Sequence, residues 1–469
     1  MHLLKTIALA TIVINIGIKI QAQQTSIKHE FSIQQCIDYA NKNNMQVKNA
    51  LLSFQNQQQV NREYTASALP TVSGSLGYTY YINTPKYVMQ DFISPAVYGV
   101  LIANNVKNGS TGQTITAPSS YSSFDFSFYQ KNNASANIQL QQILFDGQVF
   151  VGLQARETSL LLQKKNIDVT QETIKTNIYK VYYQLVISQT QTQILDANIN
   201  LIKKLQHDDS IMYKNGFIEK LDLDKVAVQL VNLQTQKEKV VNSIQIGYLG
   251  LKTLLGMPVN DELILTDKVS EDDIRSGLID TGYNYDSRKE FQYLNVARKL
   301  NEYNIKRYKL SYYPSVALAG SYGKMAMSNE FDIFSKGSWL TTSYVGLNIS
   351  VPIFDGFYKD SKIKEAKIAL QQTDNQIDNL KLSIDNEVAQ AKVNYATAIA
   401  TLNNQKQNMQ LAQSVYDQTK KKYEAGTGSN LEINNAQTDL ITAQTNYISA
   451  MYDAAIAKVD YNKAVGKLN

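Results

Sequence analysis

The stretch "ILFDGQ" occupies residues 143–148 and "PIFDGF" occupies residues 352–357, so Phe-Asp-Gly occurs twice, with Phe145 and Phe354 separated by 209 positions. Each copy follows a stretch in which apolar and polar residues alternate, and each precedes a long stretch with helical periodicity. A tripeptide match is weak evidence by itself. Whether the chain is duplicated therefore depends on whether the surroundings of the tripeptide also repeat.

The surroundings do repeat. "YKNGFIEKLDL" (213–223) aligns with "YEAGTGSNLEI" (423–433) at an offset of 210, and "LLGMP" aligns with "AVGKL" at the same offset. Upstream, Pro70 in "ALPTVSGSLGY" pairs with Pro314 in "YYPSVALAGSYG" at an offset of 244. The sequence therefore predicts a tandem repeat in which the first half carries one longer loop, between about residues 83 and 133.

Apolar residues recur every seven positions after each Phe-Asp-Gly, which is typical of helices that pack along a seam. The first series is Leu153, Leu160, Ile167, Ile174 and Val181, resuming at Leu195 and Ile202; the second is Ile363, Leu370, Ile377, Ile384, Ala391 and Ala398. We expect long helices over about 148–214 and 357–424, and return helices over about 218–255 and 430–465. At 1.5 Å per residue each long helix measures about 100 Å, which is longer than a compact domain needs.

Four stretches alternate between apolar and polar residues with a period of two, the pattern of half-buried strands. They lie at about 70–82, 122–146, 314–327 and 340–354. In an exported protein, strands of about ten residues with aromatic ends also fit an outer-membrane barrel. We expect Trp339, the one tryptophan, at the lipid interface beside the last strand.

The two tripeptides are interpreted as strand-to-helix junctions and not as catalytic sites. Gly147 and Gly356 are expected to permit the sharp change of backbone direction. Asp146 and Asp355 are expected to accept hydrogen bonds from free amides at the helix start. We place Phe145 and Phe354 at the end of the apolar strand face.

Residues 1–22 have the features of a secretory signal peptide: a positive charge at Lys5, an apolar stretch over 7–18, and a small residue, Ala22, before the cleavage point. Lys19 interrupts a run that is already shorter than the roughly 20 residues needed to span a bilayer. The lone cysteine, Cys36, lies beyond this leader in "FSIQQCIDYANKNN", where we expect a buried helix residue and not a lipid attachment site.

Composition argues against several functions. Only three histidines and one cysteine occur in 469 residues, which disfavours a zinc site or a histidine-based triad. The net charge of +5 is too small to indicate a nucleic-acid partner. We therefore expect no enzyme activity, no cofactor and no metal site.

Four strands in one chain cannot close a barrel, because the smallest membrane barrels have about eight strands. Lipid offers no hydrogen bonds to a free sheet edge, so several copies must combine their strands. On these grounds alone, either two or three copies would serve.

The chain resembles the TolC-like outer-membrane efflux proteins. The resemblance covers nearly the whole chain after the leader, and it rests on "FSIQQCIDYANKNN", both proline-led strand entries, both Phe-Asp-Gly junctions, both "YxxG" turns and "LKTLLGMP". It implies an α+β membrane protein: a homotrimer with one transmembrane β-barrel, four strands per chain, continued by a long α-helical barrel in the periplasm. It also implies an outer-membrane location in contact with lipid.

The resemblance implies the partners and the division of the chain as well. Family members act as exit ducts of tripartite efflux pumps, to which a periplasmic adaptor protein and an inner-membrane transporter deliver small molecules. An alternative is the outer-membrane channel of a type I protein secretion system. We divide the chain into a first repeat (23–256), an inter-repeat equatorial segment (257–286) and a second repeat (287–469).

The turns between the long and the return helices are expected to form the periplasmic tip. Gly216 and Gly426 are candidates for left-handed helix ends. In the family these turns close the tunnel, and by their spacing from the glycines Asp222 and Glu432 match its acidic positions. Tyr423 matches a gate tyrosine that would bond to Asp222 of the neighbouring hairpin.

Two residues depart from the family pattern at the tip. Gly428 stands where some members have a gate arginine, and Asn435 stands where a second acidic ring could lie. Three symmetry-related Glu432 side chains would form a ring that favours cations at the constriction; the alternative is an ordinary solvated Glu432. For the whole chain, the alternative of a different class is a secreted coiled-coil adhesin, which explains the heptads but not the alternating stretches.

Overall fold

The computed structural model describes residues 27–276, 282–332, 335 and 339–468. The expected signal peptide at 1–22 lies outside these residues. The chain divides into two compact units, one formed by residues up to 58, 157–301 and 368–469, and the other by 59–156 and 302–367. The boundaries between these units fall within α3 (Met45–Ala66), α5 (Gly147–Lys214), α8 (Lys289–Leu310) and α9 (Tyr358–Glu424).

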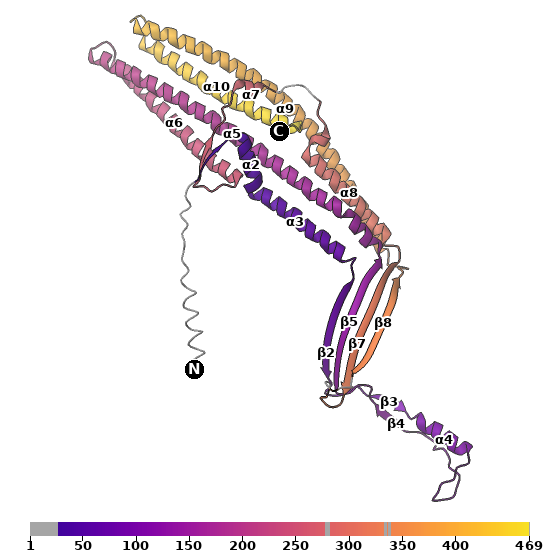
Figure 1. Ribbon diagram of the computed structural model, residues 1–469. Helices are drawn as coiled ribbons and strands as arrows, with labels where there is room; N and C mark the ends of the chain where they lie inside the picture. The colour runs from indigo at the N-terminus through magenta and orange to yellow at the C-terminus, as the bar shows by residue number, and fades with distance from the viewer. Residues whose placement is uncertain (1–26, 277–281, 333–334, 336–338, 469) are drawn as a thin grey trace, which may run out of the picture. The chain divides into compact units, whose positions relative to one another are not determined.

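The second unit contains a four-stranded antiparallel sheet in the order β2-β5-β7-β8 (Figure 1). Its strands are β2 (Thr71–Tyr80), β5 (Asn132–Phe145), β7 (Ser315–Ser328) and β8 (Trp339–Ser350). The expectation of four strands per chain is confirmed. The strands from the two repeats meet at the β5–β7 pair, with Leu140 opposite Gly320.

The sheet has one apolar and one polar face, because paired residues on neighbouring strands point the same way. The register aligns Val72 with Leu140 and Gly320 with Val345, whereas Ser73 aligns with Gln139 and Ser321. The mainly apolar face carries Val72, Leu76, Ile138, Leu140, Leu318, Tyr322, Val345, Leu347 and Ile349, together with Gln142 and Lys324. The mainly polar face carries Ser73, Ser75, Asn137, Gln139, Ser321, Thr342 and Asn348, together with Met325, Leu340 and Tyr344.

Two strands differ from the ranges that the alternation indicated. β5 begins at Asn132 and not near 122, because residues 123–126 form β4 (Ser123–Phe126), which pairs with β3 (Tyr87–Gln90) in a separate sheet. β8 ends at Ser350, two residues before Pro352, whose missing N–H cannot continue a ladder. Between β3 and β4 lies the apolar helix α4 (Ile93–Ala103). Residues 82–131 are called the outer module below.

The two junctions begin their helices in different ways. The Asp146 carboxylate accepts hydrogen bonds from the amides of Gln148 (2.8 Å) and Val149 (3.2 Å), as an N-cap does. A Cβ on Gly147 would lie 2.6 Å from the carbonyl oxygen of Leu310, so this glycine permits a close backbone approach and not a left-handed turn.

At the second junction, Gly356 does adopt a left-handed backbone with φ of 65°, and so does Phe357. The Asp355 carboxylate accepts a hydrogen bond from the amide of Lys359 at 3.2 Å. Phe354 is exposed, and its ring lies 5.7 Å from that of Phe357.

The first unit is dominated by two helical hairpins, α5–α6 and α9–α10 (Figure 1). α5 has 68 residues and α9 has 67, and they are followed by α6 (Lys220–Leu255) and α10 (Asn430–Ala464). Shorter elements are α2 (Ile33–Asn43), α7 (Glu271–Arg275), a 3-10 turn (Tyr285–Ser287), and β1 (Lys28–Phe31), which pairs in parallel with β6 (Glu262–Leu265). Because both halves repeat hairpin and strands, the expected internal duplication is confirmed.

Buried apolar side chains hold α2 against the first hairpin. Cys36, Tyr182 and Leu251 are fully buried and belong to one cluster. Burial raises the pKa of the Cys36 thiol to about 12, which leaves it protonated and unreactive. The expectation that Cys36 is a buried helix residue is confirmed. No helix among the described residues is long and apolar enough to cross a membrane.

Candidate functional site at the hairpin tips

Each long helix ends in a glycine with left-handed backbone, Gly216 with φ of 75° and Gly426 with φ of 74°. The amide of Phe217 donates to the Met212 carbonyl, and the amide of Thr427 donates to the Lys422 carbonyl, at 2.9 and 3.0 Å. Each of these bonds joins an amide to the carbonyl five residues earlier, and the glycine amide donates to the carbonyl three residues earlier. Together the two bonds satisfy carbonyls at the end of each helix. Both tips therefore have the same rigid turn.

α10 begins with a reciprocal cap that uses Glu432. The Glu432 amide donates to the Ser429 hydroxyl oxygen at 3.2 Å, and the Ser429 amide donates to the Glu432 carboxylate at 3.4 Å. The negative charge also lies in the first turn, where the helix dipole favours it. Glu432 thus has a structural role and is exposed at the same time.

The two hairpins are tied together near their tips by a buried carboxylate on α5. Asp209 is 0% exposed and accepts a hydrogen bond from the Tyr423 hydroxyl at 2.7 Å and from the Asn430 amide nitrogen at 2.8 Å. Tyr423 ends α9 and Asn430 begins α10, so one α5 side chain joins both arms of the other hairpin. We call Asp209, Tyr423 and Asn430 the tip latch.

The tip latch replaces the pairing that we expected from the resemblance. Within the chain the Tyr423 hydroxyl donates to Asp209 and not to Asp222, which forms an ion pair with Lys225 at 3.3 Å. The sequence does contain a signal for Asp209: it lies seven residues after Ile202, in the next position of the apolar heptad series. A charged residue in a seam position is costly to bury unless hydrogen bonds satisfy it.

Burial, and then the hydrogen bond to Asp209, raise the pKa of Tyr423, so its hydroxyl remains a donor across the physiological range. The seam beside the latch is also polar: Asn434 and Gln437 are buried on α10, and Gln229 of α6 donates to the Asn434 carbonyl. The Gln437 side-chain amide has no hydrogen-bond partner among the described residues. The remaining amides and the one carboxylate can hold helices together, but they offer no nucleophile with a base.

Gly428 departs from the family pattern for a visible reason. A Cβ at Gly428 would lie 3.0 Å from the backbone nitrogen of Tyr423 and 3.2 Å from Lys422, which is tighter than ordinary packing. An arginine in its place would force the turn to shift. Asn435 is exposed on α10 and adds no charge to the tip.

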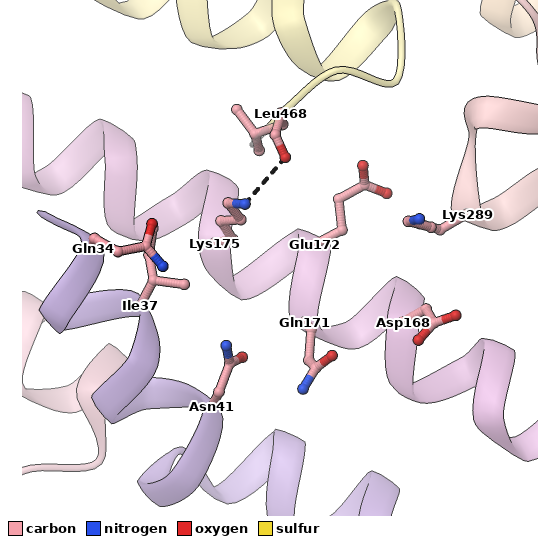
Figure 2. Close-up of a pocket in the computed structure, with 9 residues that line it drawn as sticks. All are labelled: Gln34, Ile37, Asn41, Asp168, Gln171, Glu172, Lys175, Lys289 and Leu468. Carbon is pink, nitrogen blue, oxygen red and sulfur yellow. Dashed lines mark hydrogen bonds between the residues drawn. The ribbon is translucent and has the colours of Figure 1, made fainter.

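A separate polar pocket of about 340 Å³ lies where α2, α5, the start of α8 and the C-terminal residues converge (Figure 2). The Lys175 ammonium donates to the Leu468 carbonyl at 3.1 Å, and Lys289 is directed toward Glu172 across the pocket (Figure 2). Burial raises the pKa of Glu172. The charges are mixed, and among the described residues no group of histidine, cysteine and carboxylate side chains could hold a metal.

Comparison with known proteins agrees with this fold. Residues 286–467 match the family model described as outer membrane efflux protein. The chain is 22% identical over 352 residues to the outer membrane protein TolC of Salmonella enteritidis, covering 72% of this chain and 70% of TolC. It is 18% identical to the proteases secretion protein PrtF of Dickeya chrysanthemi, covering 72% and 74%.

Two solved structures have the same fold at low identity. CusC superposes with a TM-score of 0.73 at 16% identity, covering 94% of this chain and 93% of that one. The Campylobacter jejuni CmeC outer membrane channel superposes with a TM-score of 0.70 at 18% identity, covering 93% and 86%. In its repeated strand–helix architecture and in these matches, the chain is similar to the TolC-like outer membrane efflux proteins.

Proposed function

We propose that the protein is the outer-membrane exit channel of a tripartite efflux assembly, through which small molecules pass without energy input from the channel itself. The observation that carries this proposal is the sheet β2-β5-β7-β8. It has an apolar face, a polar face, and two edges, at β2 and β8, with which no other described strand of the same chain pairs.

These edges are the argument for a trimer. In lipid an unpaired edge leaves backbone donors and acceptors without partners. If β2 of one copy pairs with β8 of the next, three copies of four strands make a closed barrel of twelve. The apolar faces then meet the outer-membrane lipid, and the polar faces line a water-filled lumen. The helical hairpins extend into the periplasm.

We further propose that the tip latch keeps the periplasmic end closed. It joins the two hairpins of one chain through a buried carboxylate, so opening that separates the hairpins must break its hydrogen bonds. Three copies of Glu432, one per chain, form an acidic ring that favours cations at the constriction. Asp222, at the start of α6, adds three carboxylates nearby.

The proposed partner at the tip is a periplasmic adaptor, which links the channel to an inner-membrane transporter. Support comes from exposed apolar surface at the tip: Phe217, in the turn between α5 and α6, is 76% exposed. A groove of about 320 Å³ runs between α9 and α10, lined by Leu411, Val415 and Ala443 among others. An amphipathic helix fits such a groove.

A type I secretion channel is the second candidate, and the relatives PrtF and alkaline protease secretion protein AprF favour it. A deletion strain separates the two proposals. Loss of a secreted protein from the medium with unchanged sensitivity to toxic small molecules would favour secretion, whereas the reverse would favour efflux.

The channel itself is tested by purification in detergent, gel migration before and after heating, and conductance in planar bilayers. We expect an oligomer that dissociates only on heating and that conducts ions in steps. A water-soluble monomer that never conducts would overturn the proposed function.

A further inference from the structure

The outer module contains an apolar surface that the channel function does not use. It lies between β2 and β5, at the end of the sheet away from the junctions with α3 and α5. From Phe92 to Val106 the chain has no charged residue, and no residue of α4 is buried. Such a helix needs an apolar environment on the side that its own module leaves open.

One side of α4 is already used by the module. Ser94, Tyr98 and Leu101 are half-buried, and the Tyr98 ring lies 6.2 Å from that of Tyr121. An adjacent side is a regular stripe at helical spacing: Ile93 is 56% exposed, Val97 48% and Val100 63%. Residues at positions i, i+4 and i+7 form a seam that packs against another helix.

We propose that this seam packs against the same seam of the two neighbouring protomers, so that three α4 helices form an apolar cap on the channel axis outside the membrane. The inference rests on the proposed trimer. A contact in which three identical faces meet one another must lie on the threefold axis, and the axis is also the path of the pore.

Proximity and charge favour a second copy over another partner. β2, which leads into the module, is the edge strand that meets the neighbouring chain, so the modules continue from the subunit boundary. With strands about 4.8 Å apart and tilted by about 40°, a twelve-stranded barrel has a radius of about 12 Å. The residues between Tyr80 and Ile93 are enough to reach the axis, and an uncharged stripe meets its copies without repulsion.

Cysteine cross-linking in lipid vesicles tests the cap directly. Val97→Cys should give a disulfide-linked dimer on a heated, non-reducing gel after mild oxidation. Ile102→Cys, on the opposite side of the same helix, should remain monomeric. The native Cys36 is buried and does not interfere. Monomer only from Val97→Cys, in protein that still migrates as a trimer without heating, would overturn the cap.

Conductance gives an independent test that does not require a disulfide. Val100→Glu places three carboxylates within the cap and should raise the single-channel conductance, whereas Ile102→Glu should leave it at the parent's value. Equal conductance for parent and Val100→Glu would contradict the cap.

Insertion of α4 into lipid is the competing outcome. A fluorophore on Val97→Cys that brominated lipids quench, with no cross-linking, would support it and exclude the cap. Failure of the proposed function looks different, because then no variant would form a trimer or conduct at all.

Discussion

Removing the Tyr423 hydroxyl is the sharpest test of the tip latch. Tyr423→Phe deletes a single oxygen, and it leaves the buried Asp209 carboxylate with the Asn430 amide as its remaining donor from the latch. The ring still fills its place in the cluster with Tyr416 and Leu440. The change therefore removes a hydrogen bond and little packing.

The expected magnitude follows from the charge of the acceptor. A hydrogen bond to a charged group contributes about 1.5–3 kcal/mol. Three latches in a trimer then contribute about 5–9 kcal/mol to the closed state if the three hairpin pairs separate together. Since about 1.4 kcal/mol changes an equilibrium tenfold, Tyr423→Phe should shift the closed-to-open ratio by roughly three to six powers of ten.

Planar-bilayer recording measures this shift as a larger conductance or longer open periods of the purified channel. Tyr416→Phe is the matched control. Tyr416 is a buried tyrosine on the same helix, and its hydroxyl has no hydrogen-bond partner among the described residues. If Tyr423→Phe conducts like the parent, or if Tyr416→Phe opens the channel equally, the latch does not hold the tip closed.

Three further changes test the sheet, the junction and the acidic ring. Glu432→Gln keeps a side chain that can complete the capping box but removes its charge; we expect the reversal potential under a salt gradient to move toward zero, and no movement would exclude a selectivity role. Val345→Arg adds a charge to the apolar face of β8 and should destabilise the folded protein by about 2–4 kcal/mol. Gly346→Arg on the polar face should be tolerated; urea titration in vesicles compares the two, and equal losses would reverse our assignment of the faces. Gly147→Ala introduces a Cβ 2.6 Å from the Leu310 carbonyl oxygen and should cost about 1–3 kcal/mol in the same titration, whereas an unchanged midpoint would refute the close approach.

Local periodicity was enough to predict the repeated helices and strands, because each depends on which face of a single element is apolar. The seven-residue series from Leu153 indicated α5, and the alternation after Pro314 indicated β7. The same alternation could not separate β4 from β5, because Phe124 and Ile138 follow the same period of two. Strand pairing depends on partners elsewhere in the chain, and Phe124 pairs with Met89 while Ile138 pairs with Gly74.

The tip latch was missed for a related reason. The resemblance carried over Asp222 by its distance from Gly216, but spacing along one helix does not determine which carboxylate faces the other hairpin. Asp209 continues the apolar seam of α5 that contains Leu195 and Ile202, whose cluster joins α5 and α6 and also includes Ile441 of α10. Its carboxylate faces Tyr423 and Asn430 of the other hairpin. A polar residue at such a position specifies a particular alignment of helices at some expense of stability, and here the partners are Tyr423 and Asn430.

The composition of the α10 seam also indicates where the hairpins can part. Near the tip the buried side chains include Asn430, Asn434 and Gln437, whereas from Ile448 to Val459 every buried residue is apolar. On separation, water can solvate these polar side chains, including the Gln437 amide, which has no hydrogen-bond partner among the described residues. Each neutral hydrogen bond that water replaces contributes only about 0.5–1.5 kcal/mol. It cannot replace apolar burial, which stabilises by about 25 cal/mol per Å². Separation of the hairpins therefore costs least at the tip, and the charged latch at Asp209 lies in the segment that most needs an additional restraint.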